Sequence, residues 1–68
     1  EHLVLRRMGA KIRQLRTERN WSQEEFAFRT SLHRNYIGGV ERGERNVSAL
    51  NLIKMAELLG VSVGKFFD

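Results

Sequence analysis

Two short helix-forming segments stand so close together in this sequence that only a tight turn can join them. The first begins at Ser22-Gln-Glu-Glu25, a capping-box pattern in which the serine and the glutamate each accept a hydrogen bond from the other's backbone. This start predicts a helix over 23–29, and the following residues predict a turn over 30–33 and a second helix over 34–42. Two helices joined in this way form a helix-turn-helix, placed here at about 23–42.

Helix signals also fill the rest of the chain. The apolar residues of the first segment recur at helical spacing, at Leu5, Met8, Ile12 and Leu15. They predict a helix over about 4–19 that ends at Asn20, because asparagine tolerates the left-handed backbone of a helix end. Ser48 is a candidate N-cap for a helix over 49–59, and Ser62 is one for a short last helix. Five helices with short connections predict an all-α fold.

Chain length limits the fold to one domain, over residues 1–68. A folded chain of this size buries only about 60% of the surface that its unfolded form exposes, so small domains gain from disulfides, a metal or a partner subunit. The sequence has no cysteine, and His2 and His33 lie far apart without thiolate partners, which argues against a zinc site. We therefore expect no metal and no other cofactor, and we expect dense helix packing together with oligomerisation.

The charge distribution favours a polyanionic partner. Residues 1–34 carry eight basic and four acidic side chains, and residues 35–68 carry four of each, so the first half holds the whole net charge of +4. Nucleic acid suits such a domain better than a membrane, and no apolar run approaches the roughly 20 residues that a membrane span needs. A basic helix face that merely contacts water explains the charge equally well.

The predicted helix over 34–42 has two chemically different faces. Ile37 and Val40 lie three residues apart and are expected to press the helix onto the core. The opposite face carries Arg34 and Asn35, whose side chains can pair bidentately with guanine and adenine respectively in the major groove. This helix is therefore the candidate recognition helix, near His33–Arg42.

Several motifs resemble a known family. The motifs are Ser22-Gln-Glu-Glu-Phe-Ala27, Tyr36-Ile37 and Glu41-Arg-Gly-Glu-Arg-Asn46. They resemble the corresponding motifs of the lambda-repressor-like (Xre-type) helix-turn-helix family of bacterial and phage regulators. The run from Leu32 to Arg42 resembles the controller proteins of restriction–modification systems, which carry Tyr-Ile-Ser-Gly-Ile-Glu-Arg there. The resemblance covers about residues 10–67. It implies a compact five-helix domain that binds a palindromic double-stranded DNA operator as a homodimer and regulates transcription.

The resemblance also implies roles for individual residues. Positions that contact bases in the family are occupied by Arg34, Asn35, Tyr36 and Gly39. Positions that contact the DNA backbone, or lie beside it, are occupied by Gln23, His33, Arg42, Arg45 and Asn46. His33 also suits an N-cap. Arg16 and Glu41 match a buried ion pair that joins the first and third helices and has a structural role.

Three positions depart from the family pattern. Ser31 stands in the turn where many members have glycine, and Val47 stands where many have proline. Gly38 replaces the serine or other polar residue that is usual there, which leaves Gly38 next to Gly39 at a cost of about 1 kcal/mol each relative to alanine. Close approach of the helix backbone to DNA explains Gly39, and Gly38 has no assigned role.

A dimer surface is expected on the C-terminal part. One recognition helix identifies few base pairs, whereas two copies would bind half-sites about 10 base pairs apart. Apolar residues beyond a complete core stripe make the candidate interface, at Leu50, Ile53 and Phe67. The alternative is that these residues widen the core of a monomer.

Other functions remain open at this stage. A phage-type or other bacterial repressor is the nearest alternative to a controller protein, and a basic protein-interaction module is an alternative from a different class. Exposure of Arg34 and Asn35 together on one helix would favour DNA. No nucleophile–base pair or glycine-rich phosphate loop is present, so we expect no enzyme. The expected location is the cytoplasm of a bacterium, at the nucleoid, with no membrane partner, and contact with RNA polymerase if the protein activates transcription.

Overall fold

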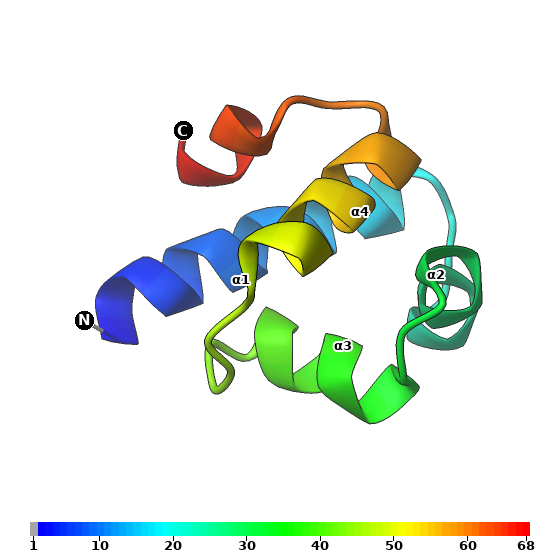
Figure 1. Ribbon diagram of the computed structural model, residues 1–68, viewed down its shortest axis with the longest axis horizontal. Coiled ribbons are helices and arrows are strands. Elements are labelled where there is room, and N and C mark those ends of the chain that lie inside the picture. The colour runs from blue at the N-terminus through cyan, green and yellow to red at the C-terminus, as the bar shows by residue number, and fades with distance from the viewer. Residues whose placement is uncertain (1) are drawn as a thin grey trace.

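Five helical segments follow one another along residues 2–68, the part of the chain that the computed structural model describes (Figure 1). They are α1 (His2–Glu18), α2 (Gln23–Thr30), α3 (Arg34–Glu41), α4 (Ala49–Leu59) and η1 (Val63–Phe67). The all-α prediction is confirmed, with no strand among the described residues. The predicted count of five helices is wrong, because residues 2–68 form four α-helices and η1 is a five-residue 3-10 helix. No helix within residues 2–68 is long and apolar enough to cross a membrane.

Serine side chains start two of the helices, as predicted. The Ser22 hydroxyl accepts a hydrogen bond from the Glu25 backbone at 3.0 Å, and Ser48 accepts one from Asn51 at 3.2 Å. The capping box at Ser22 is only half formed, since the Glu25 carboxylate lies 2.8 Å from Arg29 Nε on the next turn of α2. At the start of η1 the Ser62 side chain makes no capping hydrogen bond.

Residues with left-handed backbone end the helices. Asn20 has a φ of 60° and Gly60 has a φ of 72°, which confirms the two predicted helix ends. Ser31 also has a φ of 60°, in the turn between α2 and α3. Its neighbour Leu32 donates a backbone hydrogen bond to the carbonyl of Ala27 at 2.9 Å, which closes the turn tightly. A side chain at this φ is strained relative to glycine.

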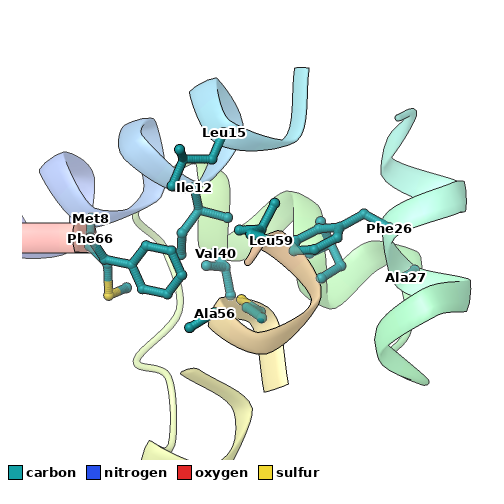
Figure 2. Packing of buried hydrophobic residues seen from close by; sticks show 11 residues of the cluster. Met8, Ile12, Leu15, Phe26, Ala27, Val40, Ala56, Leu59 and Phe66 are labelled. Atoms are coloured by element: carbon teal, nitrogen blue, oxygen red, sulfur yellow. The ribbon is translucent and has the colours of Figure 1, made fainter. Parts of the chain in front are cut away.

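The core lies between α1, α4 and the helix-turn-helix (Figure 2). Every helical segment contributes to it, through Met8, Ile12 and Leu15, Phe26 and Ala27, Ile37 and Val40, Met55, Ala56 and Leu59, and Phe66. The neighbouring phenylalanines diverge: Phe66 is 1% exposed and Phe67 is 54% exposed. The apolar spacing therefore identified the core-facing side of α1 and of α3, where Met8, Ile12, Leu15, Ile37 and Val40 are all buried.

One close backbone contact positions α3 against α1. A Cβ atom at Gly9 would lie only 2.2 Å from the carbonyl oxygen of Val40, so any side chain there would force the two helices apart. The contact presses the end of α3 onto the middle of α1. In the molecule as a whole, α3 lies at one side, and η1 with the C-terminus lies at the other (Figure 1).

Candidate nucleic-acid interface

The outer face of α3 carries exposed polar side chains, and its inner face carries buried apolar side chains. Ile37 and Val40 are fully buried, whereas Arg34 and Asn35 are both exposed in the first turn. A shallow polar pocket of about 200 Å³ lies beside them, lined by Gln23, Arg34, Asn35, Gly38 and Arg42. The fold therefore brings together residues from α2 and α3 that the sequence predicted separately as DNA contacts.

Gly38 lies in this pocket, where the sequence assigned it no role. A Cβ atom at Gly38 would lie 3.1 Å from Arg42 Nη1 and 3.5 Å from Gln23 Oε1. A side chain would therefore crowd the two polar groups that flank the pocket. The missing side chain leaves room for Gln23 and Arg42 to lie against α3.

The exposed arginines of the interface are held by carboxylates of neighbouring segments. Arg34 Nη1 lies 3.2 Å from Glu24 Oε2, and Arg42 Nε lies 3.1 Å from Glu44 Oε1. Exposed pairs of this kind contribute about 0–1 kcal/mol, so a phosphate or base can displace the carboxylate at little cost. No local sequence pattern indicates which carboxylate will meet which arginine, so these pairings were not predicted.

Beneath the interface, Arg16 and Glu41 form a bidentate buried ion pair. Arg16 Nε donates to Glu41 Oε2 at 2.6 Å and Nη2 donates to Oε1 at 2.9 Å, with the side chains 9% and 3% exposed. Arg16 also donates to the carbonyl of Trp21 at 2.7 Å, and Gln23 Nε2 donates to Glu41 Oε1 at 3.0 Å. This network joins α1, α2 and α3 at one point, and no buried side-chain nitrogen or oxygen among the described residues lacks a hydrogen-bond partner. Gln23, a predicted DNA-backbone contact, is thereby held in place beside the pocket.

His33 occupies the N-cap of α3. Its Nδ1 accepts a hydrogen bond from the backbone of Asn35 at 3.0 Å. A neutral imidazole that accepts at Nδ1 carries its proton on Nε2. The exposed His33 side chain therefore caps the helix and still has an N–H group to donate, so the N-cap role leaves the predicted backbone contact possible.

Tyr36, in the first turn of α3, and Arg45, in the loop after the helix, form a second polar group. The Tyr36 hydroxyl accepts a hydrogen bond from Asn51 Nδ2 at 3.1 Å, which ties α3 to the first turn of α4. The Arg45 guanidinium lies 5.6 Å from the centre of the Tyr36 ring, and Gly39 is buried below Arg45. The next residue in the loop, Asn46, is exposed. Asn51 was missed by sequence reasoning, since nothing in its neighbourhood marks a partner on another helix.

The predicted dimer residues are all exposed. Leu50 is 74% exposed and Ile53 is 44% exposed on α4, and Phe67 is 54% exposed on η1. The widened monomer core proposed as their alternative is therefore wrong for these side chains. Phe28 on α2 is 82% exposed, which the sequence analysis did not anticipate because its neighbours Phe26 and Ala27 are both core residues.

Comparison with known proteins shows extensive similarity. The sequence profile of the helix-turn-helix family matches residues 12–66. Control protein C.BamHI from Bacillus amyloliquefaciens is 48% identical over 61 residues, a match that spans 88% of this chain and 75% of that protein.

Two solved structures extend the comparison to three dimensions. The restriction-modification controller protein C.AhdI from Aeromonas hydrophila has a TM-score of 0.89 and 46% identity, covering 93% of this chain and 96% of that one. The biofilm regulator SinR, whose structure is of a complex with DNA, has a TM-score of 0.85 and 32% identity, covering 90% of this chain and 98% of that one.

Proposed function

The chain belongs to the helix-turn-helix family, and from its similarity to C.BamHI and C.AhdI we propose that it is a controller protein of a restriction–modification system. In this role it regulates transcription by sequence-specific binding to double-stranded DNA, on a palindromic operator and as a homodimer. It is a DNA-binding regulator and not an enzyme, in keeping with the control proteins that it matches. Such a regulator acts at the nucleoid in the bacterial cytoplasm, and activation of transcription would also require contact with RNA polymerase.

The observation that carries this proposal is the exposure of Arg34 and Asn35 side by side at the start of α3. A helix fits the major groove, where these two side chain types match guanine and adenine edges. Neither side chain is committed to the core, and the weak pair between Arg34 and Glu24 is readily exchanged. We assign base recognition to Arg34, Asn35 and Tyr36; Gly39 is buried beneath Arg45 and is not assigned a base contact.

The remaining interface residues suit contacts with phosphates. They surround α3 and supply N–H donors, and we assign this role to Gln23, His33, Arg42, Arg45 and Asn46. Phosphate contacts position a protein on the duplex, whereas base contacts determine which sequence it prefers. The buried pair of Arg16 and Glu41 joins α1 to α3 and is not assigned a DNA contact.

A matched pair of substitutions tests the assignment of base recognition. The preferred site is first obtained by selection from random duplexes. Arg34→Ala should then weaken binding to this site by about 1–3 kcal/mol and relax the preference at one base pair. Lys65→Ala, which removes the same charge from η1 on the far side of the molecule, should leave both unchanged (Figure 1). An unaltered selected sequence for Arg34→Ala would refute the assignment.

Salt dependence separates DNA binding from a basic protein-interaction module. Release of counterions gives a log–log slope of about −0.9 per phosphate contacted, so affinity should fall steeply as salt rises. A flat dependence would favour the protein-interaction module instead.

Sedimentation equilibrium tests the dimer. The protein should form dimers at tens of micromolar alone or with operator DNA, through Leu50, Ile53 and Phe67. Leu50→Glu should abolish pairing and leave the fold intact, because the Leu50 side chain is already exposed in the monomer. A wild-type protein that stays monomeric in both conditions would overturn the proposed assembly.

A further inference from the structure

Gly39 lies where the backbone of α3 meets the side chain of Arg45. We propose that Gly39 is a positioning residue for DNA recognition, because its missing side chain allows Arg45 to lie across α3 against the Tyr36 ring, in the place from which Arg45 contacts DNA. This inference rests on the proposed function. It differs from the sequence-based explanation, in which Gly39 is small so that DNA itself can approach the helix backbone.

The space above Gly39 is filled by one side chain. A Cβ atom at this position would lie 2.8 Å from Arg45 Cγ, 3.5 Å from Arg45 Nε and 3.7 Å from Arg45 Cδ. The three nearest atoms thus all belong to Arg45, and a contact of 2.8 Å is too short to persist. Alanine at position 39 would therefore displace Arg45, whereas the helix backbone itself has no reason to move.

The end of α3 explains how Arg45 reaches this position. Gly43 has a φ of 76°, and its N–H donates to the carbonyl of Val40 at 3.0 Å. The N–H of Glu44 donates to the carbonyl of Gly39 itself at 2.9 Å. These two bonds form a Schellman motif, which turns the chain back over the last turn of the helix. Arg45 is the next residue, so the loop delivers its side chain onto Gly39.

Tyr36 provides the second support for Arg45. It lies one helical turn before Gly39, and the Arg45 guanidinium lies 5.6 Å from the centre of its ring, within the range of a cation–π interaction. The ring is itself restrained, since Asn51 Nδ2 donates to its hydroxyl at 3.1 Å. Arg45 is thereby ordered before DNA arrives, which reduces the rotamer entropy lost on binding.

A double-substitution cycle tests the inference. Operator affinity is measured at low salt for the wild type, Gly39→Ala, Arg45→Ala and the double variant. Gly39→Ala should weaken binding about two- to tenfold, the effect of disordering one long side chain. In the Arg45→Ala background the same change should have no effect, because there is no arginine left to displace. Gly64→Ala is the matched control, since a Cβ atom there meets only Ser62 Oγ at 3.9 Å.

Equal losses from Gly39→Ala in both backgrounds would overturn the inference and favour direct approach of DNA to Gly39. No loss in the wild-type background would overturn it as well. Failure of the wild type to bind any selected duplex would instead refute the proposed function.

A measurement on the free protein is independent of DNA. The Arg45 Nε heteronuclear NOE should be high in the wild type and should fall in Gly39→Ala, while the melting temperature is kept or raised because alanine favours helix. A low NOE in the wild type would contradict the ordering of Arg45, whatever the folding of the variant.

Discussion

Replacement of Arg16 by methionine should bring the domain close to unfolding. The Glu41 carboxylate, 3% exposed, would lose its guanidinium hydrogen bonds of 2.6 and 2.9 Å and keep only the Gln23 amide. Leaving one member of a buried pair unpaired costs about 3–5 kcal/mol. The total stability of a domain of this size is about 3–10 kcal/mol, at 0.05–0.15 kcal/mol per residue. The single change therefore removes a large part of the free energy of unfolding.

The double variant Arg16→Met with Glu41→Leu should be much less damaging. It removes both charges, and the groups that lose a partner, the Trp21 carbonyl and the Gln23 amide, are only half-buried and can hydrogen-bond to water instead. The two single changes are therefore expected to be strongly non-additive.

Urea unfolding followed by circular dichroism measures the stability of all four proteins in this cycle. Glu25→Gln serves as the control, because its exposed pair with Arg29 on α2 contributes less than about 1 kcal/mol. Single changes at Arg16 and Glu41 that are additive and below about 1 kcal/mol would refute the reasoning, since they would place both groups in contact with water.

Three further outcomes are expected. Ser31→Gly should raise the free energy of unfolding by about 1 kcal/mol, because it relieves the φ of 60° in the turn, and a lower melting temperature would contradict this. Gly9→Ala should destabilise by about 1–3 kcal/mol or more in urea unfolding, because its Cβ would meet the Val40 carbonyl at 2.2 Å; a neutral change would show that the helices move apart freely. Glu24→Gln should tighten operator binding up to about fivefold at low salt by freeing Arg34, an effect that should shrink as salt rises. Weaker binding in a titration at low salt would argue against this.

The sequence by itself determined where α4 begins and ends, and it placed the ends of α1, α2 and α3 to within two residues. Ser48 and Gly60 enclose α4 at the predicted bounds, Ala49–Leu59, and Asn20 adopts the left-handed backbone expected at the end of α1. These features depend on hydrogen bonds and backbone preferences within about one helical turn, which neighbouring residues control. Apolar periodicity likewise identified the buried sides of α1 and α3, because burial follows the helical repeat.

Only the tertiary structure decided which distant side chains meet. Nothing near Asn51 indicates that it holds the Tyr36 hydroxyl, and nothing near Gly39 indicates that Arg45 covers it. The same is true of Glu24, which pairs with Arg34 across the two helices of the motif. Such contacts depend on how separate helices cross and on where a loop returns. Local sequence preferences do not specify these positions, because packing of the whole core sets them.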